Sequence, residues 1–158
     1  MNRLIVLTLA LLPMLAACSD QDPAEPLAQN TAPTEPRVEL TRTPSAEGAR
    51  VFFISPTDGE TVTSPVRVEF GIAGMTVVPA GDMTPQSGHH HLLIDTGLPD
   101  LGLPIPMDAN HVHFGDGSTS TEISLEPGEH TLQMLLGDHL HIPHEPPLTS
   151  DQITVIVE

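Results

Sequence analysis

The stretch Val66-Arg67-Val68-Glu69-Phe70-Gly71-Ile72 alternates large apolar residues with polar or small ones. Successive side chains of a β-strand point to opposite faces of the sheet, so a period of two residues indicates a strand with one buried face. The chain shows no period near 3.6 residues, which an amphipathic helix would require. The stretch therefore predicts a β domain.

Five further segments carry short apolar runs between turn residues: 51–54, 90–94, 121–125, 130–136 and 153–157. Several short strands with turn signals between them are typical of a sandwich of antiparallel strands. Residues 50–158 also have the usual length of an immunoglobulin domain. We therefore predict an all-β fold, an immunoglobulin-like antiparallel β-sandwich, over residues 50–158.

A late turn of this predicted domain has the sequence Pro-Gly-Glu-His-Thr-Leu, at residues 127–132. It resembles a corner of bacterial immunoglobulin-like modules in which a tyrosine often follows Pro-Gly-x. Here the residue is His130. We expect His130 to form structural hydrogen bonds rather than to bind a ligand.

Residues 1–17 have the features of a signal peptide, with Arg3 before an apolar run. The tetrad Leu-Ala-Ala-Cys that ends at Cys18 resembles the bacterial lipobox. That resemblance implies cleavage before Cys18, lipid attachment to this residue, and a membrane as partner. A conventional signal peptide with a chance cysteine is the alternative.

The residue after the lipobox cysteine is Ser19, where an aspartate would favour retention in the inner membrane. We therefore predict an outer-membrane lipoprotein that faces the periplasm, with inner-membrane anchoring or secretion as alternatives. Residues 18–49 are rich in proline and poor in apolar residues, so we expect a disordered tether there.

The chain is acidic, with 5 Lys and Arg against 21 Asp and Glu and a formal net charge of -16. Such a chain repels nucleic acid and attracts cations, although acidity can also serve solubility alone. The sequence contains neither Trp nor Tyr, which argues against a protein that stacks bases or sugars. We therefore expect no nucleic-acid partner.

Eight of the nine histidines lie in three short runs, each with a His-x-His pair whose side chains share one face of an extended strand. Neutral imidazole is the commonest protein ligand for metals, and sites of three or four histidines suit copper or zinc. We predict a site for a copper or zinc ion. The candidate ligands are His89, His91, His111, His113, His139, His141 and His144.

Strand order would bring the three runs to one end of the sandwich. The first run would begin the third strand, and the third run, residues 139–144, would follow the sixth strand at the same end of the same sheet. The second run, residues 111–113, would end a segment that returns antiparallel to the third strand.

Other residues near the runs could tune such a site. A carboxylate that accepts the second ring N–H of a ligating histidine fixes its tautomer, and the candidates are Asp95, Asp108, Asp116 and Asp138. A thioether beside imidazole would favour Cu(I), which places copper slightly ahead of zinc. The methionines in flanking loops are Met75, Met83 and Met107, and filling gaps is the commoner role of this residue.

Two other interpretations of the histidines stay open: they could hydrogen-bond loop carbonyls, or they could act as a pH switch. The sequence contains no nucleophile elbow, His-Glu-x-x-His motif or phosphate loop, and no general base stands out. Copper-zinc superoxide dismutase is also a sandwich with clustered histidines, but its pattern is not matched here. We therefore expect a protein without catalytic activity that stores, delivers or sequesters a transition metal. The alternative is a cell-envelope interaction module with an envelope protein as partner.

The chain resembles a bacterial family described as domain of unknown function 4399. Three motifs carry the resemblance: Gly-His-His-His-Leu-Leu-Ile-Asp at 88–95, His-Val-His-Phe-Gly-Asp-Gly at 111–117 and Gly-Asp-His-Leu-His-Ile-Pro-His at 137–144. The resemblance covers about residues 50–157. It implies a secreted or periplasmic domain and no particular activity.

Overall fold

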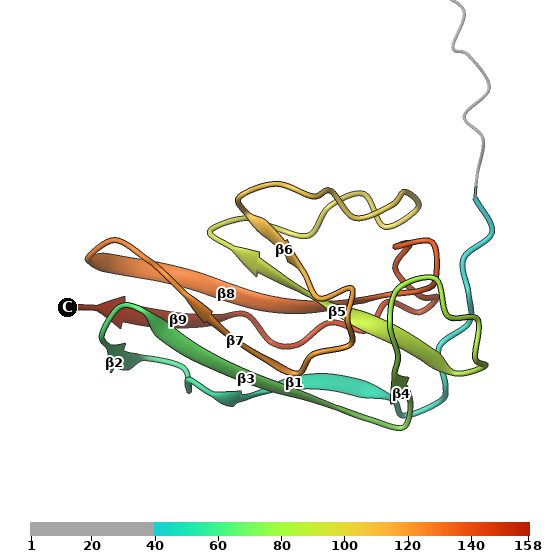
Figure 1. Cartoon of the computed structure of the whole chain (residues 1–158), viewed down its shortest axis with the longest axis horizontal. Coiled ribbons are helices and arrows are strands. Elements are labelled where there is room, and N and C mark those ends of the chain that lie inside the picture. Colours follow the sequence, from blue (N-terminus) through green and yellow to red (C-terminus); the bar gives the residue numbers. More distant parts are fainter. Residues whose placement is uncertain (1–39) are drawn as a thin grey trace, which may run out of the picture. The chain divides into compact units, whose positions relative to one another are not determined.

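Nine β-strands make up the regular structure of residues 40–158, the part of the chain that the computed structural model describes (Figure 1). They are β1 (Arg50–Ser55), β2 (Glu60–Val62), β3 (Val66–Ala73), β4 (Thr76–Val77), β5 (Ser87–Ile94), β6 (His111–His113), β7 (Ser120–Ile123), β8 (Gly128–Gly137) and β9 (Ile153–Val157). Within residues 40–158, no helix is long and apolar enough to cross a lipid bilayer.

The strands form two sheets. One has the order β1-β3-β7, and the other has the order β2-β9-β8-β5-β4, with β6 paired to β5. All pairs are antiparallel except β2 with β9 and β4 with β5, which are parallel. The order β1-β3-β7 opposite β9-β8-β5 corresponds to the A-B-E and G-F-C strands of an immunoglobulin sandwich. The prediction of an all-β sandwich is therefore confirmed.

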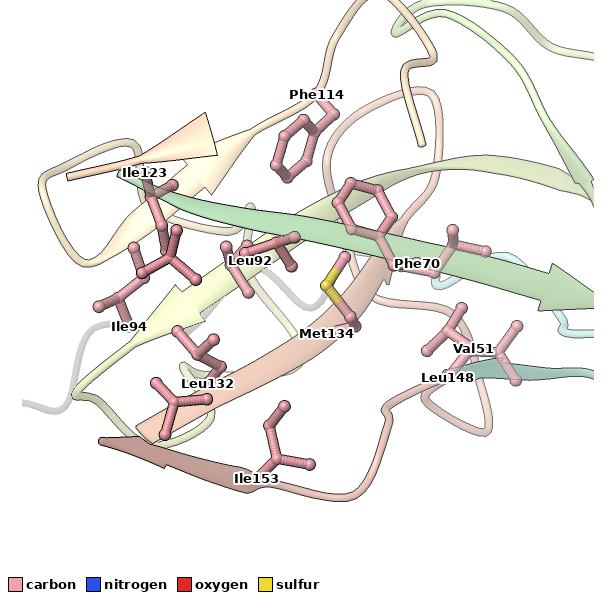
Figure 2. Close-up of a cluster of buried hydrophobic side chains, with 14 of the residues drawn as sticks. Val51, Phe70, Leu92, Ile94, Phe114, Ile123, Leu132, Met134, Leu148 and Ile153 are labelled. Atoms are coloured by element: carbon pink, nitrogen blue, oxygen red, sulfur yellow. The ribbon is translucent and has the colours of Figure 1, made fainter. Parts of the chain in front are cut away.

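An apolar core lies between the two sheets (Figure 2). Val68 and Phe70 of β3 contribute to it, as do Leu92 of β5 and Met134 of β8. The rings of Phe70 and Phe114 pack with their centroids 4.8 Å apart. Burial of one such side chain contributes about 1.5–3 kcal/mol to the free energy of unfolding. The alternating apolar residues of β3 therefore stabilise the sandwich through this core.

Strand β5 is buried on both faces, and all eight of its residues are shielded from solvent. His90 and Leu92 lie on the face toward the main core, where the His90 ring packs edge-on against Phe70. Alternation along the strand puts His89, His91 and Leu93 on the opposite face. This opposite face is the one that carries the histidine pair.

A second, smaller apolar cluster covers part of that opposite face. Leu93 packs there with Leu135 and Ile105, and Leu101 adds to the cluster from its edge. Ile105 and Leu101 belong to the connection between β5 and β6, which lies beyond β8 on the side away from β1 and β3 (Figure 1). We call this connection, residues 95–110, the cover segment.

The folded part of the chain begins before the predicted boundary at residue 50. The backbone N–H of Ser45 donates to the carbonyl of Glu145, and the N–H of Glu145 donates to the carbonyl of Thr43. Ala49 packs against the main core. The last residues of the predicted tether therefore belong to the domain. The predicted signal peptide, Cys18 and the rest of the predicted tether lie outside the described residues.

Two short strands were not predicted. Glu60–Val62 forms β2 beside the end of β9, and Thr76–Val77 forms β4 beside the start of β5. Both have only two or three residues. A segment this short shows no periodicity of its own, so its sequence does not predict a strand. Its strand conformation comes from pairing with a longer neighbour.

Candidate metal centre

Three histidines from three separate elements converge on the outer face of β5. They are His89 of β5, His113 of β6 and His141 of the loop that follows β8. One ring nitrogen from each lies within 4.8 Å of those of the other two, which is close enough to hold a metal ion. The Nε2 atoms of His113 and His141 are 3.2 Å apart.

His91 completes a cluster of four imidazole rings. Its ring centroid lies 4.8 Å from that of His89, 5.1 Å from that of His113 and 6.0 Å from that of His141. His89 and His91 are fully buried, whereas His113 and His141 are partly exposed. We call these four residues the histidine cluster. Its exposed side is formed by β6 and the loop after β8.

Strand register explains why the cluster forms. His91 pairs with His113 in the β5–β6 ladder, so these two side chains stand next to each other on the same face. His89 lies opposite Gly137, the last residue of β8. The chain leaves β8 at this point and turns back over the sheet, which brings His141 above His89 and His113.

Two glycines leave room for the imidazole rings. A Cβ atom at Gly137 would lie 2.8 Å from Cε1 of His91, and a Cβ atom at Gly115 would lie 2.4 Å from Cε1 of His113. Real Cβ atoms do not come this close to other heavy atoms. Any larger residue at Gly115 or Gly137 would therefore collide with an imidazole ring.

Asp138 shapes the loop that carries His141. Its Oδ1 atom accepts hydrogen bonds from the backbone N–H groups of Leu140, at 2.8 Å, and Ile142, at 3.0 Å. His141 itself has a φ of 65°, in the left-handed region that non-glycine residues rarely adopt. Its carbonyl accepts a hydrogen bond from the N–H of Ile105, 2.8 Å away in the cover segment. The backbone around His141 is therefore held from both sides.

The buried imidazoles are held in the neutral form. Burial, followed by repulsion from His141 and His113, lowers the pKa of His89 to about 4. Burial and then the neighbouring rings lower the pKa of His91 to about 2. Burial also lowers the pKa of His113, with a further contribution from His141. A neutral ring has a free nitrogen lone pair at neutral pH, which is the form that binds metals.

The ring nitrogens of the buried pair have no hydrogen-bond partner. Within residues 40–158, neither nitrogen of His89 and neither nitrogen of His91 is hydrogen-bonded, although all four atoms are inaccessible to solvent. Buried polar groups in folded proteins are normally satisfied, because an unsatisfied one costs about 1–3 kcal/mol. Two adjacent unsatisfied imidazoles therefore need a specific explanation.

The structure places the other three candidate ligands outside the cluster. His111 lies on β6, and its Nδ1 atom is 2.8 Å from Oδ1 of Asp108. The Nε2 atom of His144 donates to the carbonyl of Ser87, and its ring lies near Gly88 on the core side of β5. His139 makes none of the ring contacts found in the described part of the chain.

Like Asp108, the other three predicted supporting aspartates bind groups other than the ring N–H of the four clustered histidines. Asp95 accepts hydrogen bonds from His130 and from the N–H of Thr131. Asp116 accepts from the N–H of Ser118 in an exposed turn. Asp138 accepts from backbone N–H groups of its own loop.

His130 hydrogen-bonds as expected. Its Nδ1 atom donates to Asp95 at 2.6 Å, and its Nε2 atom lies 2.8 Å from the carbonyl of Glu126. The Asp95 carboxylate, with help from the Glu126 carbonyl, raises the pKa of His130 above its usual value. The predicted structural hydrogen bonds of His130 are therefore confirmed.

Some residues that shape the site could not be identified from the histidine pattern. Gly115 closely follows the second run and Gly137 closely precedes the third, and that proximity was the available signal. Ile105 and Thr43 form hydrogen bonds to the loop around His141, but neither lies close to a histidine run in sequence. Of the flanking methionines, Met75 packs on the main core, and Met83 and Met107 are mostly exposed.

Comparison with known proteins adds a family but no activity. No curated protein matches the chain, and no solved structure matches it either. The model of one protein family, described as a domain of unknown function (DUF4399), matches residues 68–158. The match begins within β3, later than the expected start near residue 50, and includes the whole histidine cluster. The chain therefore belongs to the family of domain of unknown function DUF4399.

Proposed function

We propose that this protein binds one transition-metal ion, copper or zinc, through His89, His91, His113 and His141. The observation that carries the proposal is the convergence of the imidazole rings on one point, where His89 and His91 are buried, neutral and without a hydrogen-bond partner. A bound cation would take one lone pair from each ring. It would thereby offset the cost of burying these polar atoms.

The separation of the ring nitrogens fits this proposal. Two nitrogens bound at about 2.0–2.1 Å to one tetrahedral ion lie about 3.3 Å apart. The Nε2 atoms of His113 and His141 are 3.2 Å apart, and the His89 nitrogen lies within 4.8 Å of both. Small ring rotations would therefore close the site around an ion. The net charge of -16 on the chain favours cations over anions.

The donor set favours neither copper nor zinc. Imidazole suits both Cu(II) and zinc, whereas a thioether ligand would have favoured Cu(I). Met75 is occupied in the main core, and Met83 and Met107 are 75% and 72% exposed. The small preference for copper that the flanking methionines suggested therefore loses its support.

The first experiment measures metal content. The full chain, purified without a histidine tag, is dialysed against copper or zinc in separate experiments, and retained metal is measured by elemental analysis. We expect about one ion per chain for one of the two metals. The His89→Ala chain should lose most of this metal. The His139→Ala chain is the matched control, because His139 lies in the same loop as His141 but outside the cluster, and it should retain the metal.

Failure of the wild-type chain to retain either metal would refute metal binding. The histidines would then be structural residues, and the alternative of a non-catalytic interaction module in the cell envelope would take precedence. The next step would be to identify the protein partner of that module.

The proposal places the domain in the periplasm as an outer-membrane lipoprotein that stores, delivers or sequesters the ion without catalytic activity. It rests on the lipobox at Cys18 and on Ser19 after it. A Cys18→Ser chain should move from the membrane fraction to the soluble fraction of the cell envelope. Unchanged membrane association would contradict a lipid anchor at this cysteine.

A further inference from the structure

A short segment before β1 lies against the loop that carries His141. We call residues 42–45 the strap and residues 138–145 the histidine loop. Backbone hydrogen bonds join the two on both sides of a parallel bridge between Pro44 and Glu145. They run from Ser45 N–H to the Glu145 carbonyl, at 3.0 Å, and from Glu145 N–H to the Thr43 carbonyl, at 2.9 Å. The strap is therefore paired with the histidine loop like a short strand.

Arg42 adds side-chain bonds to the same loop. Its Nε atom donates to the carbonyl of Pro143 at 2.9 Å, and its guanidinium also donates to the carbonyl of His144 and to the carboxylate of Glu145. A guanidinium offers several N–H donors in a fixed plane, so one side chain can satisfy several acceptors of one loop. The end of the histidine loop is thus held by the first residue of the strap.

Thr43 connects the strap to the turn beneath His141. Its hydroxyl donates to Oδ2 of Asp138 at 2.7 Å, while Oδ1 of the same carboxylate accepts the N–H groups of Leu140 and Ile142. The Asp138 residue is 2% exposed, so its carboxylate is shielded from water. The carboxylate therefore joins the strap to the backbone on both sides of His141.

We propose that the strap is a positioning element of the histidine cluster, that Thr43 is its positioning residue, and that strap seating and metal binding are reciprocally coupled. This inference rests on the proposed metal binding and adds a mode of regulation to it. The part of the chain that precedes the strap would then be able to influence the affinity of the cluster for metal.

The physical basis is the conformation of His141. A non-glycine residue with a φ of 65° persists only where its surroundings hold it there. Asp138 supplies part of that restraint, and Thr43 fixes Asp138. If a seated strap raises the affinity for metal by some factor, bound metal must raise the ratio of seated to unseated strap by the same factor.

The test uses Cu(II) as the probe and the full chain as the protein. Thr43→Val removes the hydroxyl and keeps the size of the side chain, and Thr43→Ser restores a hydroxyl. Thr57→Val is the matched control, because the Thr57 hydroxyl also donates to a carboxylate, that of Glu60 at 3.0 Å, away from the cluster. We expect Thr43→Val to raise the Kd for Cu(II) about tenfold. Thr43→Ser and Thr57→Val should stay near the wild-type value.

Two further readouts separate positioning from general stability. The Cu(II) electron paramagnetic resonance spectrum should show one fewer imidazole nitrogen in Thr43→Val, as in a His141→Ala chain. Trypsin should report the strap directly, because all five basic residues of the chain are arginines and one of them is Arg42. Bound Cu(II) should slow cleavage after Arg42 in the wild-type chain and have a smaller effect in Thr43→Val.

The outcomes distinguish this inference from the proposed function. In one outcome, the wild-type chain binds Cu(II), and Thr43→Val shows the same Kd, spectrum and cleavage pattern. This outcome would overturn the positioning role of Thr43 and leave the proposed metal binding intact. Equal losses of affinity in Thr43→Val and Thr57→Val would also overturn it, because they would reflect general destabilisation. A chain that binds neither metal would refute the proposed function and this inference together.

Discussion

The imidazole of His91 occupies the space that a side chain on Gly137 would need, since a Cβ atom there would lie 2.8 Å from Cε1 of His91. The same Cβ would lie 3.3 Å from Cα of His141. One glycine therefore makes room for two members of the histidine cluster, which come from different elements.

This relationship predicts the effect of Gly137→Ala. The added methyl group must displace the His91 ring or the His141 backbone, so we expect about a tenfold loss of metal affinity and a destabilisation of about 1–3 kcal/mol. Isothermal titration calorimetry and chemical denaturation measure the two effects. Gly97→Ala is the control, because a Cβ atom at Gly97 meets no atom within 4 Å. Unchanged affinity in Gly137→Ala would show that His91 does not contribute to the site.

Two neighbouring histidines should separate stability from metal binding. His90 and His91 are both fully buried with both ring nitrogens unbonded, but His90 faces the main core and His91 faces the cluster. Leucine has a similar size and no polar atom to desolvate. We therefore expect His90→Leu and His91→Leu each to leave the metal-free domain as stable as before, or to stabilise it by about 1–2 kcal/mol.

Metal binding should distinguish this pair. His91→Leu should lose most of the thermal stabilisation by added metal, which arises because metal binds the folded state. His90→Leu should keep it. Equal behaviour of the two chains in a thermal melt with and without metal would contradict the assignment of His91 to the cluster.

Acid should destabilise the metal-free domain well above the pH at which its carboxylates titrate. Burial lowers the pKa of His90 to about 4, from 6.5 for an unperturbed histidine. Between these pH values the unfolded chain binds a proton that the folded chain does not, so stability is full above pH 6.5 and falls as pH drops toward 4. The contribution of His90 is on the order of 3 kcal/mol at full titration. Urea denaturation across this range, with a chelator present, should show a weaker pH dependence in His90→Leu than in the wild-type chain.

The pair of His130 and Asp95 should respond to pH in the opposite sense. Asp95 raises the pKa of His130, so the stabilisation from this pair is complete below pH 6.5 and is lost as pH rises through the raised pKa. Nuclear magnetic resonance titration of the ring should show a pKa above 6.5 that falls in Asp95→Asn. Asp151→Asn removes an exposed carboxylate elsewhere and should leave the pKa of His130 unchanged. A wild-type value at or below 6.5 would contradict the bond between the two residues.

The architecture could be predicted because it depends on local patterns. The alternation in Val66–Ala73 marks a strand with one buried face, and Val66, Val68 and Phe70 are indeed buried. The same rule places His89 and His91 on one face of β5 and His90 on the other. Strand order then predicted that β6 would return antiparallel to β5, which the pairing of His91 with His113 confirms.

The composition of the cluster could not be predicted, because it depends on contacts between distant residues. His111 shares a face of β6 with His113, yet its ring bonds to Asp108 instead. His141 and His144 lie in the same loop, but the path of the loop sends them to opposite faces of β5. That path is held by Thr43, which is 95 residues from Asp138 in sequence. Sequence spacing carries no information about such a contact.

The histidine cluster lies on the outer face of β5, and the apolar core that stabilises the sandwich lies on the other face. The domain can therefore change or lose its ligands without giving up the packing that makes it fold. In evolutionary terms, under the proposed function such a site is free to drift, to exchange one metal for another or to disappear, while selection for a folded domain acts on a separate set of residues. A protein engineer has the same freedom, and could build a different binding site on this face of an unchanged scaffold.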